Sequence, residues 1–561
     1  MTRMREGAAN GPSLMRRYGD IARVLVRHGL ADVVDTLHLG SSLAWGTRVL
    51  PPRARMAALS RAARLRLTLE ELGPTFVKFG QALSVRSDLL PADLVAELAM
   101  LQEHVAPLAP GTAESAIEAA FGHPVGALFP TFETTPIASA SIAQVHRAAL
   151  PSGEIVAVKV RRPGIAGTIA ADVEILRQLA RLVQRHVPAA DAVDPVRVVD
   201  EFARTIRSEQ DLIREGRNLE RCAANFTGDP TVHFPRVYWE RTTSSVLTME
   251  YLDGVKVTEL DAAGIGPFAR RSIARRGADA ILRQVLEHGF FHADPHPGNL
   301  VVMADNVIGF LDLGMVGRLD DRARRALARI VHAIQHRDTA ELTAVALEIM
   351  ETRGEIDVAA LERDLAALIE LYGDVPLADL SVRDLLGDVV GTAARHRLRF
   401  PSPLMLLIKA LVTIEGVGAR LDPAFKMVEH AAPMAERLRQ RELAPDAIAS
   451  RVMQALAQTA TAVRTMPMHL DAIARKVRDG RLQVQFVHRN LDHFVHEMDR
   501  ASNRIAFALI IAALIVGSSL IIHAGRGATA YGYPVLGLIG FLVAAVFGVG
   551  LAIGIMRSGR L

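Results

Sequence analysis

The sequence predicts an α+β fold with a small β-rich lobe, a larger helical lobe and a closing pair of apolar helices. Three observations lead to this prediction. Two β-type segments flank a Pro-Ser-Gly turn within residues 137–160, helical patterns fill residues 164–226 and 320–500, and two long apolar runs follow. We expect four regions, namely a helical extension (1–110), the β-rich lobe with a helical insertion (111–254), the helical lobe (255–500) and the apolar helices (501–561).

Composition narrows the possible functions. A chain of 561 residues is too long for one compact core, so more than one domain is expected. The formal net charge of +4 is weak for a nucleic-acid binder, and no basic stripe alternates with aromatic residues. The single cysteine, Cys222, excludes an internal disulfide. The N-terminal residues have no apolar stretch suited to a secretory signal, so the catalytic part is expected in the cytosol.

The first hundred residues are predicted to be helical. An amphipathic stretch over about 18–39 is interpreted as a packing helix, with a helix lying on a membrane surface as the alternative. Residues 56–105 read as helices broken at Gly73-Pro74 and at Pro91. Lys78 and Gln81 stand three positions apart and therefore share one helix face.

The β-rich lobe carries a strand that ends in Val-Ala-Val-Lys159, which is the context of the lysine that reaches the α- and β-phosphates in a kinase. A protein kinase has a glycine-rich loop before this strand. Here the corresponding positions are small but not glycine: Ala138, Ser139, Ala140, Ser141 and Ala143. Alanine restricts the backbone conformations that glycine allows, so we expect a different phosphate clamp.

Residues 164–226 are predicted to be mostly helical. Glu209, Asp211 and Glu215 are placed on one charged helix, and Glu215 is the candidate ion-pair partner of Lys159. The long separation between Lys159 and Glu215 predicts extra helices inserted between them. A solvated helix face is the alternative interpretation of these acidic residues.

Residues 246–254 are interpreted as a strand that leaves into a short linker, at the place of a kinase hinge. Met249 would then line the adenine pocket, and the backbone of Glu250 and Leu252 would face the base. An ordinary strand and turn is the alternative.

The candidate catalytic residues lie between residues 288 and 317. Asp294 and Asn299 have the spacing of a kinase catalytic loop, and Asp312-Leu-Gly stands where a kinase has Asp-Phe-Gly. A hairpin of short strands at 300–303 and 307–310 would bring Asn299 and Asp312 to one site. Their oxygen atoms suit Mg²⁺ bound with the phosphates of ATP, while Asp294 would act as base or orient the nucleophile.

This stretch has two alternative interpretations. Zinc at His292 and His296 is disfavoured because no cysteine or further ligand pair stands at structural-zinc spacing. Protein kinase activity is also not expected. There is no room for a long activation segment before the helix predicted at 320–336, no Ala-Pro-Glu follows, and Ala293 replaces the arginine that usually precedes the catalytic aspartate.

The apolar runs at 505–523 and 535–556 are each long enough to span a membrane. Basic residues flank their outer ends, namely Arg500, Arg504, Arg557 and Arg560. The positive-inside rule therefore predicts a multi-pass protein of the inner (cytoplasmic) membrane with its catalytic part in the cytoplasm. A buried core hairpin is the alternative. Gly550 and Gly554 form a small-xxx-small pair that suits helix packing.

Together these motifs resemble the UbiB/AarF family of atypical kinase-like proteins. The resemblance covers about residues 69–425 and rests on LGPTFVKFGQ, PIASASIAQVHRA, VAVKV, EQDLIREGRN, FFHADPHPGN, DLG and LIKALVTIEGVGARLDP. It implies a protein-kinase-like bilobal fold, ATP and Mg²⁺ as cofactors, and support of ubiquinone or other isoprenoid-quinone biosynthesis. Many members have an unbroken alanine run in the phosphate loop, which Ser139 interrupts here.

The resemblance also implies residue roles. Asp294, Lys159 and Glu215 would be catalytic, and Asn299 and Asp312 would hold metal. Lys78 and Gln81 would be regulatory, packed over the active site with Glu209 and Asp211 as partners. The nucleotide would contact Lys159 and a further set of residues: Ala138, Ser139, Ala140, Ser141, Ile142, Ala143, Gln144, Glu250 and Leu252.

The first hypothesis is a membrane-anchored atypical kinase that hydrolyses ATP and moves or presents hydrophobic quinone precursors. Its expected partners are membrane lipids, isoprenoid quinone precursors and quinone-biosynthesis enzymes, and not nucleic acid. A true small-molecule or lipid kinase is the second hypothesis, and the same residues would serve it. A non-enzymatic, nucleotide-switched membrane scaffold is the third. It is disfavoured because the chain retains all five candidate catalytic and metal residues. The oligomeric state stays open.

Overall fold

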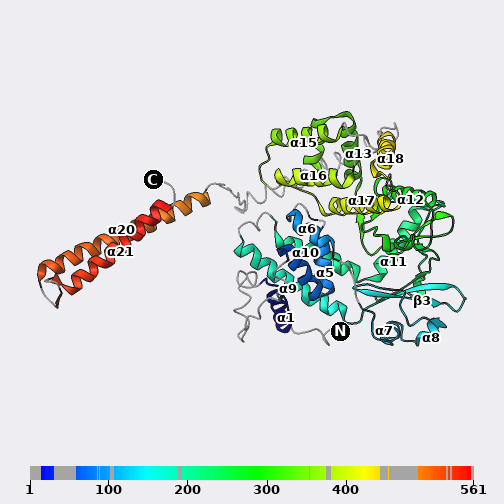
Figure 1. Cartoon of the computed structure of the whole chain (residues 1–561), viewed down its shortest axis with the longest axis horizontal. Coiled ribbons are helices and arrows are strands. Elements are labelled where there is room, and N and C mark those ends of the chain that lie inside the picture. The colour runs from blue at the N-terminus through cyan, green and yellow to red at the C-terminus, as the bar shows by residue number, and fades with distance from the viewer. Residues whose placement is uncertain are drawn as a thin grey trace, which may run out of the picture. The chain divides into compact units, whose positions relative to one another are not determined.

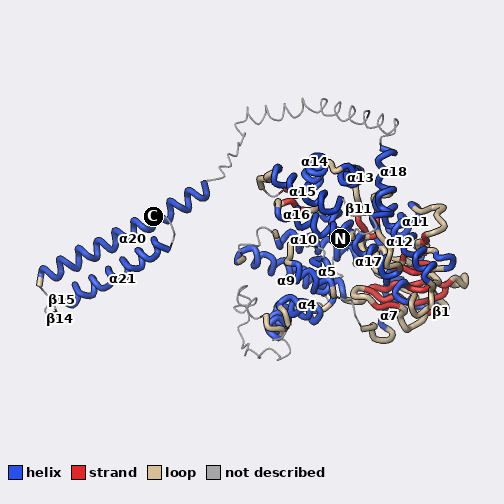
Figure 2. The backbone as a smooth tube through the Cα atoms, turned by 45° about the horizontal axis from the view of Figure 1, so that its top comes forward, coloured by secondary structure: helices blue, strands red, loops and turns tan. Residues whose placement is uncertain are grey.

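The computed structural model forms two compact units, Met1–Ser450 and Arg451–Leu561 (Figure 1). In the first unit most strands lie at one end, whereas β11 (Val316–Arg318) lies among the helices (Figure 2). The structure describes residues 14–30, 59–84, 86, 89–101, 106–187, 193–352, 354–373, 381–442, 453, 491–525, 528–530 and 533–557.

The small lobe is built on a five-stranded antiparallel sheet in the order β1-β3-β4-β6, with β2 paired to β3. Its strands are β1 (Thr131–Phe132), β2 (Ala138–Ser139), β3 (Ala143–Ala149), β4 (Ile155–Arg161) and β6 (Val246–Glu250). Alternate residues of β4 face opposite sides. Val156 and Val158 pack in the cluster that includes Ile117 of α7 (Thr112–Phe121) and Val125 of α8 (Val125–Leu128). Ala157 belongs to the core on the other side, and Lys159 follows two positions later.

The N-terminal extension and the helical insertion form one layer with a common core. Phe76 and Leu69 from the extension share a buried cluster with Val173 and Phe202 from the insertion. The helices of this layer are α1 (Leu14–Arg27), α4 (Arg61–Leu72), α5 (Pro74–Ser84), α6 (Ala92–Ala99), α9 (Ile165–His186) and α10 (Pro195–Glu209). The predicted breaks at Gly73-Pro74 and Pro91 separate α4, α5 and α6. The amphipathic face of α1 packs into the same cluster through Ile21 and Leu25, as the packing interpretation expects.

The prediction of one charged helix for the acidic residues 209–215 is wrong. Glu209 ends α10, and Glu215 lies on a separate helix, α11 (Leu212–Asn225). Asp211 between them has extended dihedral angles, and its carboxylate accepts a hydrogen bond from the Ile213 amide. Aspartate caps a helix N-terminus more favourably than it sits inside a helix, so it starts a new helix here.

The large lobe surrounds short strands that carry the catalytic motifs. Its four-stranded sheet has the order β5-β10-β9-β7, and β8 pairs with β11. These elements are β5 (Val232–His233), β7 (Val255–Lys256), η4 (Val257–Glu259), α12 (Pro267–Leu286), β8 (Phe290–His292), η5 (Pro297–Asn299), β9 (Leu300–Val302), η6 (Ala304–Asn306), β10 (Ile308–Phe310) and β11 (Val316–Arg318). The short helix η3 (Trp239–Arg241) instead packs on β6 of the small lobe. The hairpin predicted around Ala304-Asp305-Asn306 is therefore present as β9 and β10.

Helices complete the large lobe and pack on α12 and on one another. They are α13 (Asp321–His336), α14 (Thr339–Ile349), α15 (Val358–Gly373), α16 (Val382–Arg395), α17 (Ser402–Leu421) and α18 (Met427–Glu442), with β12 (Glu351–Thr352) paired to β13 (Leu398–Arg399). The predicted helix at 320–336 matches α13, which Asp320 caps. Pro376, where the sequence also predicts a helix break, lies outside the described residues, as does Arg560 at the C-terminal end.

The second unit is a helical hairpin of α20 (Leu491–Ala524) and α21 (Val535–Arg557), joined through β14 (Thr529–Ala530) and β15 (Tyr533–Pro534). The boundary predicted at residue 500 falls inside α20, which runs from Leu491 to Ala524. The apolar windows Ser502–Ala524 and Val535–Ala552 are only 6% and 11% buried, which disagrees with a buried core hairpin.

Contact within the hairpin is closest near its turn. A Cβ atom added to Gly537 would lie 3.0 Å from the Ser518 carbonyl oxygen, and one added to Gly540 would collide with the Ser518 hydroxyl. At Gly550 an added Cβ would meet nothing within 4 Å. The small residues that let the two helices approach are therefore Gly537 and Gly540, and the predicted packing role of Gly550 is not used in this hairpin.

Candidate active site

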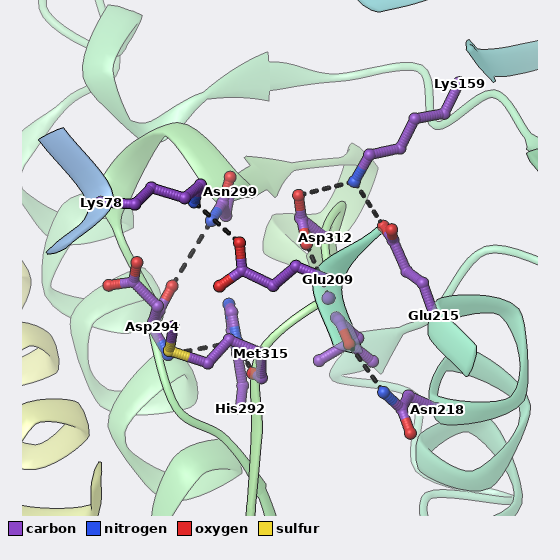
Figure 3. Close-up of polar contacts among 12 residues, drawn as sticks. Lys78, Lys159, Glu209, Glu215, Asn218, His292, Asp294, Asn299, Asp312 and Met315 are labelled. Atoms are coloured by element: carbon purple, nitrogen blue, oxygen red, sulfur yellow. Dashed lines mark hydrogen bonds and ion pairs between the residues drawn. The ribbon is translucent and has the colours of Figure 1, made fainter. Parts of the chain in front are cut away.

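Lys159, Glu215 and Asp312 meet at the junction of the two lobes (Figure 3). Lys159 Nζ donates to Glu215 Oε1 at 2.6 Å and to Asp312 Oδ2 at 2.8 Å. The Gly314 amide donates to the other Asp312 oxygen at 2.7 Å, which fixes the carboxylate in the turn after β10. The side chain of Glu215 is 3% exposed and that of Asp312 is 39% exposed, so the cluster opens on the Asp312 side.

Two carboxylates compete for one ammonium group in this cluster. Burial opposes the charge on Lys159, but Asp312 and Glu215 outweigh it and raise the pKa of the lysine above its ordinary value. Burial likewise opposes the charge on Asp312, but Lys159 and the Gly314 amide outweigh it and lower the pKa of that carboxyl. Burial and the nearby Asp312 charge raise the pKa of Glu215 to about 7. The more buried carboxyl group is thus the one that is harder to ionise.

Asp294 and Asn299 lie on one tight turn between β8 and β9. The His296 amide donates to the Asp294 carbonyl at 2.7 Å, the Asn299 amide donates to the His296 carbonyl at 2.8 Å, and Asn299 Nδ2 lies 3.4 Å from the Asp294 carbonyl oxygen. Leu311 donates to the Asn299 carbonyl at 2.9 Å, which ties this turn to the strand that leads to Asp312. The hairpin therefore brings both predicted metal ligands to the same end of the β9–β10 pair.

The two histidines of this turn hold its backbone. His296 Nδ1 accepts a hydrogen bond from the Gly298 amide at 3.1 Å. His292 is buried, its Nδ1 lies 3.4 Å from both the Met315 carbonyl oxygen and the Asp294 amide nitrogen, and burial lowers its pKa. Among the described residues no group of three or more His, Cys, Asp or Glu side chains could hold a metal ion.

Lys409 contacts the candidate catalytic carboxylate and was missed from the sequence. Its Nζ lies 3.0 Å from Asp294 Oδ1, although it comes from α17, more than a hundred residues further along the chain. Burial acts to raise the pKa of Asp294, but the attraction of Lys409 outweighs it and the pKa falls below its ordinary value. The available signal was a single lysine in the apolar stretch Pro-Leu-Met-Leu-Leu-Ile-Lys-Ala-Leu-Val.

Arg162 holds the loop that replaces the glycine-rich loop, and it was also missed. Its guanidinium donates to the Ser139 hydroxyl at 2.7 Å and to the Ala140 carbonyl at 3.0 Å, and its backbone amide donates to the Ile142 carbonyl at 2.8 Å. Ser139, which interrupts the alanine run, therefore provides an acceptor for this arginine. Within the loop, the Ala140 amide donates to the Ala143 carbonyl at 2.9 Å.

The other predicted loop residues differ in burial. Ile142 is buried in the core of the helical layer, and Ser141, Ala143 and Gln144 are also buried. Ala138 is exposed at the start of β2. Any contact of the buried residues with phosphate would therefore come from backbone groups, and their side chains set the shape of the loop.

The K-x-G-Q helix, α5, lies beside the catalytic loop. Lys78 Nζ pairs with Glu209 Oε2 at 3.0 Å, and the Lys78–Glu209 pair is seen near Asp294 in Figure 3. Lys78 also contributes to the lowered pKa of Asp294. Gln81 donates instead to the Leu101 carbonyl at 3.1 Å, and the Asp211 carboxylate caps α11.

Residues of the predicted hinge follow β6. Met249 and Leu252 are buried, and the Glu250 carboxylate accepts from the Arg236 amide at 3.1 Å and lies 2.9 Å from His233 Nε2. The Glu250 amide donates to the Arg236 carbonyl at 2.8 Å. The adenine contact of this segment stays a prediction.

Comparisons with known proteins identify the family of the chain. Residues 100–346 match the ABC1 atypical kinase-like domain, residues 365–426 match the UbiB helical domain, and residues 489–557 match the ABC1/UbiB kinase-like C-terminal domain. A relative named "Probable protein kinase UbiB" from Xanthomonas campestris pv. campestris (strain 8004) is 35% identical over 524 residues, covering 90% of this chain and 93% of the relative. The chain belongs to the UbiB/ABC1 family of atypical kinases.

A second UbiB relative of the same name, from Pseudomonas aeruginosa (strain LESB58), is 37% identical over 457 residues, covering 79% of this chain and 85% of the relative. The solved complex of Rv3197 with erythromycin from Mycobacterium tuberculosis aligns with a TM-score of 0.45 and 23% identity, covering 67% of this chain and 95% of that chain. The predicted kinase-like α+β fold is thus confirmed by the family match, and a kinase-like domain implies nucleotide binding.

The side-chain oxygens of Asn299 and Asp312 are of the kind that Mg²⁺ prefers. In the structure the Lys159 ammonium lies against Asp312 Oδ2, so a positive charge already occupies the space beside that carboxylate. Asn299 places its amide nitrogen toward the Asp294 carbonyl, which leaves its side-chain oxygen as a ligand. Mg²⁺ usually takes only one or two protein oxygens and completes its shell with phosphate and water. When bound, the ion would neutralise phosphate charge that builds up during phosphoryl transfer.

Proposed function

We propose that this UbiB-family protein is a membrane-anchored ATP hydrolase that uses Mg-ATP to support isoprenoid-quinone biosynthesis. One observation carries the proposal. Lys159 bonds both Glu215 and Asp312 at the lobe junction, while Asp294 and Asn299 lie on the turn that precedes the Asp312 hairpin. This set of residues suits phosphoryl transfer, because its catalysis depends on positioned charge rather than on covalent participation of the protein.

In this proposal each side chain has one task. Lys159, oriented by Glu215, binds the α- and β-phosphates once Asp312 has turned toward the metal. Asn299 and Asp312 hold Mg²⁺, and the carboxylate of Asp294 orients the attacking water. Glu215 is buried and therefore acts on Lys159 alone, as an orienting group.

The surroundings of Asp294 favour water or a small acceptor over a protein substrate. Helix α5 lies beside the catalytic loop with Lys78 paired to Glu209. β11 leads through Leu319 and Asp320 directly into α13, so no long activation segment offers a platform for a peptide. Because the relatives are named probable protein kinases, the experiment below also measures transfer of labelled phosphate to protein.

The hairpin of α20 and α21 supports a membrane location. Both helices expose most of their apolar residues, and Arg504 and Arg557 lie toward their outer ends. We propose that the hairpin spans the inner (cytoplasmic) membrane with both outer ends in the cytoplasm. ATP turnover would then extract or present hydrophobic quinone precursors to quinone-biosynthesis enzymes.

The test uses the full chain in lipid vesicles with Mg-ATP labelled at the γ-phosphate. We expect labelled free phosphate, and a loss of at least about 100-fold in Asp312→Asn, which removes the metal charge partner. Glu240→Gln serves as the control because its side chain is 93% exposed. Label in the lipid extract would instead identify a lipid kinase, and label on protein a protein kinase.

A cell-level measurement tests the quinone role. In a strain that lacks this protein, the wild type should restore isoprenoid-quinone content, whereas Asp312→Asn should not. Equal restoration by both chains would refute the proposal that ATP turnover supports quinone synthesis.

A further inference from the structure

We propose that Lys409 is a catalytic residue whose ammonium group binds the γ-phosphate of ATP during phosphoryl transfer. This inference rests on the proposed function and adds a residue from the UbiB helical domain to the kinase-like site. Lys409 Nζ lies 3.0 Å from Asp294 Oδ1. Asp294 therefore keeps the lysine at the place where the attacking group and the γ-phosphate meet.

The helix that carries Lys409 is packed into the core on one face. Helix α17 packs along α12 and contacts β11, and its buried residues include Met405, Leu407, Ala410 and Ile414. Strand β11 pairs with β8, which leads directly to the catalytic turn. The lysine and the aspartate are thus positioned by packed elements, as a catalytic pair requires.

Stability alone does not account for a lysine at this position. Its side chain is 20% exposed and lies on a helix that is otherwise rich in leucine, isoleucine and valine. A partly buried ion pair is weak evidence for stability, because desolvation offsets most of the attraction and an apolar residue would serve as well. A cation next to a catalytic carboxylate is explained by charge that develops during the reaction.

The catalytic loop supplies no permanent cation of its own. The residues between Asp294 and Asn299 are Pro295, His296, Pro297 and Gly298, and Ala293 precedes Asp294. Lys159 is engaged at the Glu215–Asp312 cluster, and Lys78 is paired with Glu209. Negative charge spreads over three oxygens of the transferring group, so a cation beside Asp294 would be directly stabilising.

The step balances without a further reactant. The oxygen of water forms a bond to the γ-phosphorus while the bond to the oxygen shared with the β-phosphate breaks. That oxygen keeps the electron pair and leaves as part of ADP. Asp294 receives a proton from the attacking water and releases it to solvent, while Lys409 stays protonated and moves from the carboxylate to the phosphoryl oxygens.

The experiment compares the full chain in lipid vesicles with Lys409→Met and Lys409→Arg. Equilibrium binding of Mg-ADP and of the non-hydrolysable analogue Mg-AMP-PNP is measured alongside ATP hydrolysis. We expect Lys409→Met to weaken AMP-PNP binding about 10-fold or more with ADP binding unchanged, because a charged hydrogen bond to the γ-phosphate is lost. The kcat should fall by about 10²- to 10³-fold. Lys409→Arg should recover part of both.

Arg420→Met is the control, since Arg420 lies on the same helix and is exposed. Equal weakening of ADP and AMP-PNP binding in Lys409→Met, or wild-type values for both binding and kcat, would overturn the proposal. The binding readout does not require turnover. If the wild type bound both nucleotides but hydrolysed no ATP, the proposed function would fail, whereas a selective loss of AMP-PNP binding would still support the γ-phosphate contact.

Discussion

Replacing Glu215 with glutamine tests the charge balance of the Lys159 cluster. The substitution keeps the shape of the side chain and a hydrogen-bond acceptor for Lys159, but it removes one of two negative charges. Glu215 is almost fully buried and lies 2.6 Å from Lys159 Nζ, while Asp312 lies 2.8 Å from the same atom. One ammonium group cannot neutralise both carboxylates, so the buried Glu215 resists ionisation.

The sign and size of the effect follow from linkage. The pKa of Glu215 is raised from 4.5 to about 7, first by burial and then by Asp312. The folded protein therefore binds this proton more tightly than the unfolded chain does. The resulting stability is fully present below about pH 4.5 and is lost as the pH rises toward 7. A displacement of this size corresponds to about 3 kcal/mol at most.

The assay is a thermal melt of the nucleotide-free protein at pH 5 and at pH 7.5, without Mg²⁺. When the pH is raised from 5 to 7.5, the Tm of the wild type should fall by a few degrees more than the Tm of Glu215→Gln. Glu240→Gln, an exposed site, should run parallel to the wild type at both pH values. At pH 7.5 the glutamine variant should be as stable as the wild type or more so, yet it should hydrolyse ATP poorly because Lys159 has lost its charged partner.

Parallel wild-type and Glu215→Gln curves would refute this reasoning, since Glu215 would then be ionised across the whole interval. The opposite trend would refute the reasoning more strongly. In that case the Tm of Glu215→Gln would fall relative to that of the wild type as the pH rises from 5 to 7.5. That result would mean that the Lys159–Glu215 attraction outweighs the burial of the carboxylate.

Two further substitutions test the support of the site. Gly216→Ala would place a Cβ 2.9 Å from the Trp239 ring and 3.3 Å from Leu247, so α11 and its glutamate should shift. We expect a loss of about 1–2 kcal/mol of stability after the gain in helix propensity, and lower ATP turnover. A Trp239→Ala background should restore turnover, and failure to do so would contradict this account. Arg162→Met should raise the KM for Mg-ATP about 10-fold and leave kcat unchanged, because the loop loses the hydrogen bond from Arg162 to the Ser139 hydroxyl. An unchanged KM would show that the loop keeps its conformation without Arg162.

Local patterns allowed much of the site to be predicted. The β3–β4 hairpin, the β9–β10 hairpin and the helix breaks at Gly73-Pro74 and Pro91 all follow from strand periodicity and turn residues within short windows. The ion pair between Lys159 and Glu215 was named from motif order alone. Asp211 was misplaced inside a helix because its capping role depends on a turn that periodicity does not reveal.

Other features depend on contacts between distant segments. Lys409 reaches Asp294 only because α17 packs on α12 and β11, and Arg162 clasps Ser139 only because β4 returns beside the loop. By helix propensity alone Gly216 weakens α11, but the structure shows that Trp239 and Leu247 leave no room for a side chain there. The shared core of the N-terminal helices with α9 and α10 likewise depends on contacts between distant segments.

The sequence by itself determined the family, the hairpins that carry the Lys159 and Asp312 motifs, and the acidic and basic groups available for phosphoryl chemistry. These depend on residue type and on spacing over a few turns or strands. Only the tertiary structure decided which of those groups meet, which carboxylate gains protection from solvent, and which lysine faces Asp294. Such pairings depend on packing across more than a hundred residues, and burial then sets the pKa of each group.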